Sequence, residues 1–280
     1  MSTAAKLAGF AATVALVSGG AALAGGGIDP DRETGEPAHE TSSPEAGHGG
    51  SGSAAMSEQH PVRGLAVAED SLRVVVDDPE LRRGIPEHLT FRVVDDRGQT
   101  VRDFDVEHEK RMHLIVARRD LTGFQHLHPR QEADGTWTTD VTLEEAGSYR
   151  LFADFAREGE PHTLGADLRV DGEADLRPLP APAATAKSDG GYDVRLDREG
   201  SELRFAITRG GDPIEAEPYL GARGHLVALR EGDMAFLHVH PLEDEPTFEA
   251  EFPSPGAYRL FLQFKHEGRV QTVAFTQEEK

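Results

Sequence analysis

From residue 62 to its end, the chain consists of short segments in which apolar and polar positions alternate or apolar residues run together. Those in the first half are rich in aromatic and β-branched residues, and turn-forming residues separate them. They include Leu89–Val94, His113–Ala117, Thr136–Leu143 and Tyr149–Phe155. The sequence from residue 62 shows no convincing 3.6-residue periodicity of an amphipathic helix. The pattern therefore predicts β-strands throughout residues 62–280.

The second half of the chain repeats the first. A group of histidine and proline positions recurs at a constant separation of 112 residues, with His113, His126, His128 and Pro129 matching His225, His238, His240 and Pro241. Further along, Gly-Ser-Tyr-Arg-Leu-Phe at 147–152 recurs as Gly-Ala-Tyr-Arg-Leu-Phe at 256–261. The chain is therefore a duplication. We expect one domain at 62–172 and another at 190–280, joined by a Pro/Ala-rich linker at 173–189.

Each repeat has the size of an immunoglobulin-like β-sandwich, because it offers about seven short strands. Tyr149 and Tyr258 follow Gly-x at the start of a late strand, as in the tyrosine corner of such sandwiches. In that motif the tyrosine hydroxyl bonds back to the backbone. The expected fold class is all-β, with two tandem immunoglobulin-like sandwiches after a hydrophobic N-terminal segment and a disordered stalk.

The N-terminal segment has the pattern of an export signal. Lys6 is the one charged residue among residues 1–24, and residues 7–24 are apolar or small. Ala22-Leu23-Ala24 fits a signal-peptidase site, but an uncleaved membrane anchor fits as well. Either way we expect an extracytoplasmic protein, secreted or anchored to the outer face of the cytoplasmic membrane by residues 7–24. Residues 25–61 are rich in Gly, Ser, Pro and Glu, which predicts a disordered stalk.

Charge and composition exclude several functions. The chain has 29 basic and 50 acidic residues and a formal net charge of −21, so bulk charge gives it no attraction to nucleic acid. It has no cysteine. Disulfides, thiolate zinc sites, iron–sulfur clusters and cysteine nucleophiles are therefore excluded. No phosphate loop or nucleotide fingerprint occurs, so we expect no organic cofactor.

The histidines recurring in both repeats predict a specific geometry. His126 and His128 lie two residues apart, so in a strand their side chains share a face. If the hairpin turns near Asp120 and Leu121, it pairs residues whose numbers add to 241. His113 then lies opposite His128 and Ile115 opposite His126. In the second repeat the same hairpin pairs residues whose numbers add to 465, with His225 opposite His240.

Three convergent neutral imidazoles with an open fourth position suit Cu(II), Zn(II) or Ni(II), and we expect copper or zinc. The predicted metal ligands are His113, His126, His128, His225, His238 and His240. Possible additional ligands are Asp154 and Gln263, which align with one another, and the non-equivalent His162 and His266. The sequence leaves open whether the repeats form two separate sites or one shared site.

At these residues the chain resembles a known group of proteins. His-Leu-(Ile/Val)-Val-Ala, Phe-x-His-x-His-Pro and Gly-x-Tyr-Arg-Leu-Phe together resemble exported bacterial Ig-like proteins related to the YtkA/FixH-like group. The resemblance covers about 90–110 residues of each repeat. It implies an extracytoplasmic sandwich domain associated with copper or another heavy metal.

Two other functions compete with metal buffering, delivery or sensing. The face of His113 also carries Ile115 and Ala117, so the histidines can instead be structural parts of a module that binds another exported or membrane protein. His126-x-His128-x3-Glu132 also resembles part of the first motif of cupin metalloenzymes. The second repeat departs from that motif, and the two repeats share no later histidine. We therefore expect a protein that is not an enzyme.

Overall fold

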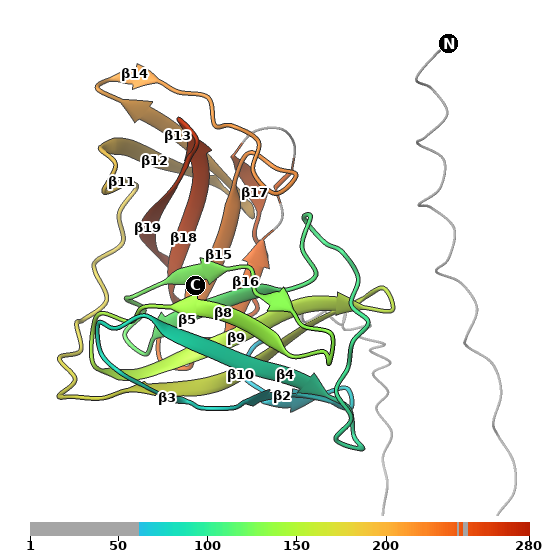
Figure 1. The fold of residues 1–280 in the computed structure, drawn as a ribbon. Coiled ribbons are helices and arrows are strands. Elements are labelled where there is room, and N and C mark those ends of the chain that lie inside the picture. The colour runs from blue at the N-terminus through green and yellow to red at the C-terminus, as the bar shows by residue number, and fades with distance from the viewer. Residues whose placement is uncertain (1–61, 240, 243–245) are drawn as a thin grey trace, which may run out of the picture. The chain divides into compact units, whose positions relative to one another are not determined.

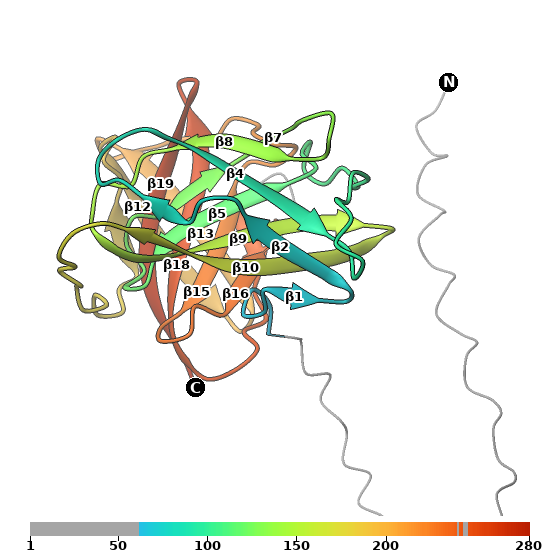
Figure 2. The ribbon, with the colours of Figure 1, turned by 60° about the horizontal axis from the view of Figure 1, so that its bottom comes forward.

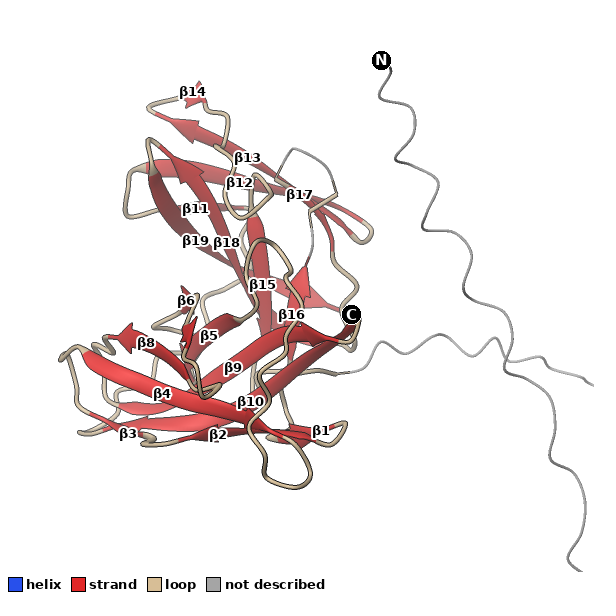
Figure 3. Cartoon of the chain, turned by 45° about the vertical axis from the view of Figure 1, so that its right-hand side comes forward, coloured by secondary structure: helices blue, strands red, loops and turns tan. Residues whose placement is uncertain are grey.

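The computed structural model describes residues 62–239, 241–242 and 246–280. The predicted signal or anchor at 1–24 and the predicted stalk at 25–61 lie outside these residues. Within the described ranges every helix or strand is a β-strand (Figure 3), as the alternating pattern predicts. The same ranges contain no helix with the length and apolar character that a membrane crossing requires.

The first repeat forms a sandwich of two sheets. One sheet has the strand order β1-β2-β4-β8-β7 and the other β3-β10-β9-β5-β6 (Figure 2). The first sheet comprises β1 (Ala68–Glu69), β2 (Leu72–Val76), β4 (Glu87–Val94), β8 (Trp137–Val141) and β7 (Arg130–Gln131). The second comprises β3 (Glu80–Leu81), β10 (Glu160–Val170), β9 (Gly147–Arg157), β5 (His113–Arg118) and β6 (Gln125–Leu127).

The second repeat forms an equivalent sandwich (Figure 1). Its first sheet has the order β11-β12-β13-β14, with β17 also pairing with β13, and its second has the order β16-β15-β18-β19. The first sheet comprises β11 (Thr185–Lys187), β12 (Tyr192–Glu199), β13 (Glu202–Arg209), β14 (Asp212–Pro213) and β17 (Thr247–Glu249). The second comprises β15 (His225–Arg230), β16 (Phe236–Val239), β18 (Gly256–His266) and β19 (Arg269–Glu279).

Both repeats carry the predicted tyrosine corner. The Tyr149 hydroxyl donates a hydrogen bond of 2.8 Å to the Glu145 carbonyl oxygen, and the Tyr258 hydroxyl donates one of 2.8 Å to the Ser254 carbonyl oxygen. Each tyrosine lies near the start of a long strand in the sheet that carries the histidines. This corner, together with the sheet orders, makes both repeats immunoglobulin-like sandwiches.

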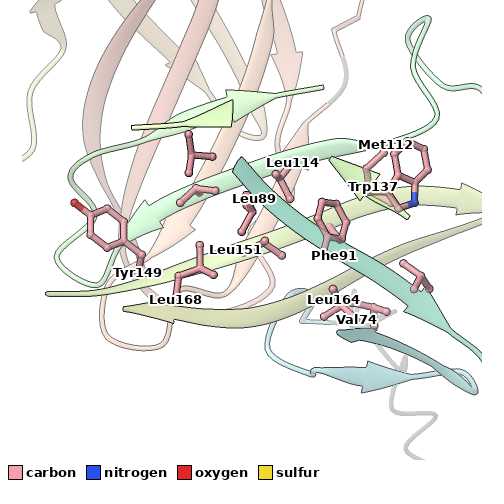
Figure 4. Close-up of a cluster of buried hydrophobic side chains, with 14 of the residues drawn as sticks. Val74, Leu89, Phe91, Met112, Leu114, Trp137, Tyr149, Leu151, Leu164 and Leu168 are labelled. Atoms are coloured by element: carbon pink, nitrogen blue, oxygen red, sulfur yellow. The ribbon is translucent and has the colours of Figure 1, made fainter. Parts of the chain in front are cut away.

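Each sandwich has its own apolar core between its two sheets. In the first, Phe91, Trp137 and Leu151 are at most 2% exposed (Figure 4). In the second, Phe205 and Phe248 fill the equivalent space. These cores form because alternate residues of each strand point inward. They fix the positions of β5 and β15, the strands on which His113 and His225 lie.

A third apolar cluster joins the two sandwiches, which belong to one compact unit. Alternate residues of β5 and β15 face away from their own cores and into this cluster, namely Ile115, Ala117, Val227 and Leu229. Phe124 stacks on Phe261 with ring centroids 4.1 Å apart, and Phe152 stacks on Phe236 at 5.1 Å. Phe124 and Phe236 are equivalent in the two repeats, as are Phe152 and Phe261. The contact is therefore reciprocal, like the isologous interface of a symmetric dimer.

Residues 62–66 cross from one sandwich to the other. The Phe236 N–H donates to the Arg63 carbonyl oxygen (3.0 Å), and the Gly64 N–H donates to the Thr163 carbonyl oxygen (3.2 Å). The guanidinium of Arg150 donates to the carbonyl oxygens of Gly64 and Leu65. This segment therefore lies against β10 and β9 of the first repeat and β16 of the second, and it adds to the contact between the repeats.

Replacing Gly64 with alanine is expected to destabilise the protein more than replacing Gly98. The two glycines have nearly the same φ, +74° and +75°, so the backbone penalty of about 1–2 kcal/mol is shared. A Cβ on Gly64 would lie 2.7 Å from Phe152 Cδ1, whereas a Cβ on Gly98 meets nothing within 4 Å. Overpacking at Gly64 should add about 1–3 kcal/mol. Urea denaturation of both variants measures the difference, and equal losses would contradict the close packing at Gly64.

A buried arginine joins the linker to the first sandwich. The Arg118 guanidinium, 1% exposed, forms a bidentate ion pair with Asp120 (2.6 and 2.9 Å) and a second ion pair with Glu145 (2.6 Å). It also donates to the carbonyl oxygen of Asp175 in the linker (3.2 Å). The Arg177 N–H donates to Asp120 in turn (2.9 Å). The start of the linker is therefore tied to the hairpin turn that positions β5 and β6.

Candidate metal centre

The hairpins that carry the histidines have the predicted register. In the first repeat Leu114 pairs with Leu127 and Ile115 with His126, so the paired residue numbers add to 241. In the second repeat Leu226 pairs with Val239, so the numbers add to 465. Both register predictions are confirmed. A slip of one residue would have placed the imidazoles on opposite faces.

The three predicted imidazoles of the first repeat come together. One ligand nitrogen from each of His113, His126 and His128 lies within 4.8 Å of the other two. His113 Nδ1 and His126 Nε2 are 3.1 Å apart, and the His128 ring centroid lies 5.0 Å from that of His113 and 4.7 Å from that of His126. His113 is 3% exposed, and the other two are half-buried. We refer to these three residues as the histidine cluster.

The second repeat lies directly against the histidine cluster. Gln263, on β18, places its carboxamide oxygen 2.8 Å from His126 Nδ1. The ring of His225, on β15, has its centroid 6.1 Å from that of His126. His225 Nε2 donates to the Tyr219 carbonyl oxygen (2.9 Å), just as His113 Nε2 donates to the Glu107 carbonyl oxygen (3.2 Å). Residues of both repeats therefore lie around the cluster.

His108 is a residue of this region that the sequence analysis missed. Its ring centroid lies 6.3 Å from that of His113 and 5.6 Å from that of His225. It sits at φ +47° in a tight turn closed by a backbone bridge between Glu107 and Lys110. The equivalent position in the second repeat is Leu220, so comparison of the repeats does not select His108. Its spacing of five residues from His113 is the only signal in the sequence.

The hydrogen bonds around the cluster determine where its protons lie. The Glu107 carbonyl oxygen only accepts, so His113 carries a proton on Nε2. The Gln263 carboxamide oxygen only accepts, so His126 carries a proton on Nδ1, and the Gln263 amide nitrogen donates to Thr272 Oγ1 (3.1 Å). In neutral rings the two facing nitrogens, His113 Nδ1 and His126 Nε2, then both present lone pairs. A shared proton or a cation between them relieves this repulsion.

The donor set fits a first-row metal ion. Metal–nitrogen bonds of about 2.0–2.1 Å in a tetrahedral site place ligand nitrogens about 3.4 Å apart. His113 Nδ1 and His126 Nε2, at 3.1 Å, are already near this spacing, and the ligand nitrogen of His128 lies within 4.8 Å of those of the other two histidines. Burial raises the pKa of the Tyr219 phenol, so this neighbouring group stays neutral at pH 7.

The other two predicted ligands of the first repeat, Asp154 and His162, have different surroundings. Asp154 pairs with His113 across β5 and β9, and it accepts a hydrogen bond of 2.6 Å from Thr163 Oγ1. His162 stacks on Phe155 with centroids 5.4 Å apart. Asp154 is therefore next to the histidine cluster, whereas His162 is not part of it.

Of the possible additional ligands in the second repeat, one contacts the histidine cluster and the other does not. Gln263 contacts the cluster, whereas His266 Nδ1 lies 2.8 Å from the Tyr192 hydroxyl, outside it. His240 lies outside the described residues. Of His238 the structure describes the backbone, which pairs with Val227. The predicted patch of the second repeat thus stays a prediction.

A cleft of about 730 Å³ opens beside the cluster, between the two sandwiches. Acidic side chains predominate among its charged residues, with Glu107, Asp154, Glu249 and Glu251 on its walls together with Arg63. Carboxylates raise the local concentration of cations but do not select among them. Two of these residues lie next to His113: Asp154 pairs with it across β5 and β9, and the Glu107 carbonyl oxygen accepts a hydrogen bond from its ring.

A family model matches the chain twice, over residues 66–172 and over residues 186–280. It describes a domain of unknown function, DUF8832. The chain belongs to the DUF8832 family. The two matches follow each other in tandem, as the internal repeat does. No curated protein matches the chain.

Three solved structures with some likeness to this DUF8832 chain are distant from it in sequence. The Escherichia coli adhesin FdeC is 15% identical, with 75% of this chain and 65% of FdeC covered and a TM-score of 0.28. Escherichia coli α2-macroglobulin activated by porcine elastase is 13% identical, with 74% and 20% covered and a TM-score of 0.28. A two-domain fibronectin type III segment of chicken tenascin is 9% identical, with 74% and 97% covered and a TM-score of 0.23. The chain spans less than two thirds of the first two, and none of these likenesses bears on what it binds.

Proposed function

We propose that this protein binds a copper(II) or zinc(II) ion through His113, His126 and His128. The observation that carries the proposal is the convergence of three ligand nitrogens within 4.8 Å of one another on one sheet face. We further propose that the protein is exported and buffers, delivers or senses the metal. The −21 charge and the predicted export signal of residues 1–24 support that location.

The chemistry of the donors supports these two metals. Imidazole is a ligand of intermediate softness, which suits Cu(II) and Zn(II), and no thiolate is present in the chain to compete. The outward N–H groups of His113 and His126 already donate to oxygen atoms of Glu107 and Gln263. Such second partners fix the tautomer and raise the basicity of a metal-bound imidazole.

The burial of the cluster supports binding rather than catalysis. His113 is 3% exposed, and Gln263 of the second repeat packs against His126. A catalytic metal keeps an open position that a substrate can reach. We therefore propose that the cluster binds a metal without the catalytic role of a cupin-like enzyme.

A protein-binding module with structural histidines is the second candidate function. The 3.1 Å contact between His113 and His126 favours it, because one shared proton can satisfy both nitrogens without a metal. In that case the histidines serve to hold the two sandwiches together. A direct binding measurement separates the two functions.

Isothermal titration of the purified, metal-stripped chain with CuCl₂ and with ZnSO₄ tests the proposal. We expect at least one tight equivalent, and a loss of affinity of more than about a hundredfold in the H113A/H126A/H128A variant, which lacks the entire ligand set. The Cu(II)-loaded protein should show nitrogen hyperfine splitting in its electron paramagnetic resonance spectrum, and the variant should not.

The matched control replaces three histidines that lie away from the cluster, in the variant H88A/H162A/H266A. This variant loses the same number of imidazoles and should bind the metal as the wild type does. Circular dichroism verifies that both variants keep the β-fold. Absence of binding by the folded wild type, or equal binding by both triple variants, would refute the metal site and favour the structural role.

A further inference from the structure

The hydrogen bond between Gln263 and His126 connects the two repeats at the histidine cluster. The carboxamide oxygen of Gln263 accepts from His126 Nδ1 at 2.8 Å, across 137 residues of sequence. We propose that Gln263 is a positioning residue for the metal site of the first repeat, so that the site is complete only when the two repeats are docked. The inference rests on the proposed function and makes metal binding depend on the docking of the two repeats.

The packing between the repeats fixes this hydrogen bond. Phe124 directly precedes β6 and lies two residues before His126, and Phe261 and Gln263 lie two residues apart on one face of β18. Phe124 stacks on Phe261 with centroids 4.1 Å apart and planes 7° apart. The stacked rings therefore hold Gln263 opposite His126, since each of these residues lies two positions after one of the two stacked phenylalanines.

Gln263 is itself held in place. Its side chain is buried, with 8% of the residue exposed, and its amide nitrogen donates to Thr272 Oγ1 at 3.1 Å. The carboxamide oxygen faces His126. This oxygen accepts and does not donate, so it keeps the proton of a neutral His126 on Nδ1. The lone pair of His126 Nε2 is then directed at the position between His126 and His113 where the metal would lie.

The arrangement implies linkage between metal binding and docking of the repeats. If docking supplies the acceptor that strengthens the site, then a bound ion must strengthen docking by the same factor. Metal-binding histidines commonly donate their second N–H to such an acceptor, and its removal typically weakens metal binding about 10–100-fold. Here the acceptor comes from the other repeat, so a bound ion would stabilise the docked arrangement of the two repeats.

Three variants of the full chain test the role of Gln263 by zinc titration. Gln263→Leu keeps the volume but removes the acceptor, and we expect zinc affinity to fall about 10–100-fold. Gln263→Glu keeps an acceptor oxygen, and we expect its zinc affinity to be at least that of the wild type. Thr272→Val removes the other partner of Gln263 but leaves the acceptor, so its loss should be smaller than that of Gln263→Leu.

A structural measurement on the wild type does not depend on how the variants fold. In the zinc-loaded protein, imidazole ¹⁵N spectra should show His126 protonated at Nδ1 and bound through Nε2, with its Nδ1–H proton close to the Gln263 side chain. Binding through Nδ1 would overturn the role of Gln263 and leave the metal site standing. Unchanged affinity in a folded Gln263→Leu variant would do the same. Failure of the wild type to bind zinc or copper would overturn both proposals.

Discussion

Replacing Arg118 with methionine is expected to lower the free energy of unfolding by about 3–5 kcal/mol. Arg118 is 1% exposed and compensates the carboxylates of Asp120 and Glu145, of which Asp120 is 4% exposed. Methionine fills most of the volume but leaves Asp120 buried without its bidentate partner. Removal of one member of a buried ion pair costs more than the pair contributes, because the remaining charge loses its compensation. Urea denaturation at pH 7 measures the loss.

Two comparisons make this prediction specific. Arg119→Met removes a neighbouring arginine whose ion pair with Asp167 is solvent-exposed, and it should cost less than about 1 kcal/mol. Burial alone would raise the pKa of Asp120, but hydrogen bonds from Arg118, from the Arg177 N–H and from Thr122 outweigh it and hold that pKa below its ordinary value. In the wild type, ionised Asp120 therefore stabilises the folded state. This contribution is fully present above about pH 4, the ordinary pKa of an aspartate, and is lost as the pH falls through the lowered pKa of Asp120.

The difference in unfolding free energy between the wild type and Arg118→Met should consequently become smaller as the pH falls. In the variant the Asp120 carboxylate can take up a proton and become neutral, whereas in the wild type acid removes a favourable ion pair. Unfolding midpoints at pH 7 and near pH 3 compare the two chains. A deficit that is the same at both pH values would contradict the assignment of the effect to Asp120.

Replacing Phe152 with alanine is expected to separate the unfolding of the two sandwiches and to cost about 3–5 kcal/mol. Phe152 is fully buried in the cluster between the sandwiches, where it stacks on Phe236. Its loss leaves a cavity in the contact, although each sandwich keeps its own core. Trp137 is the one tryptophan of the chain and lies in the first core, so its fluorescence reports on the first sandwich. Far-ultraviolet circular dichroism reports on both.

The wild type should give coincident transitions with the two probes, and Phe152→Ala should give transitions at different urea concentrations. Phe155→Ala serves as the control, because Phe155 is 3% exposed in the first core and lies edge-on to Phe104. It should lower stability by a similar amount but keep the two transitions together. Separate transitions in the wild type would mean that the contact between the sandwiches does not couple them.

Local sequence patterns predict the strands, their register and the convergence of the first three histidines. The hairpin register follows from turn position and from the alternation of faces, which act over fewer than twenty residues. The tyrosine corners at Tyr149 and Tyr258 are local for the same reason, since each hydroxyl bonds four residues upstream.

Contacts between the repeats could not be predicted in the same way. The proximity of Gln263 and His225 to His126 depends on how two folded sheets pack, and no pattern within one strand specifies that. One signal was nonetheless present. The segments at 114–117 and 226–229 are continuously apolar, and all six positions of β5 are buried. A run without alternation indicates a strand covered on both faces.

The reciprocal stacking of Phe124 on Phe261 and of Phe152 on Phe236 has a genetic consequence. In a homodimer of single-repeat chains, both sides of such an interface come from one codon and must carry the same residue. Joining the copies in one chain keeps their effective concentration high whatever the protein concentration. It also lets equivalent positions differ, as Asp154 and Gln263 do, or His108 and Leu220. Under the proposed function, tandem fusion thus permits one repeat to specialise in holding the ion while the other repeat supplies the residues that support the site.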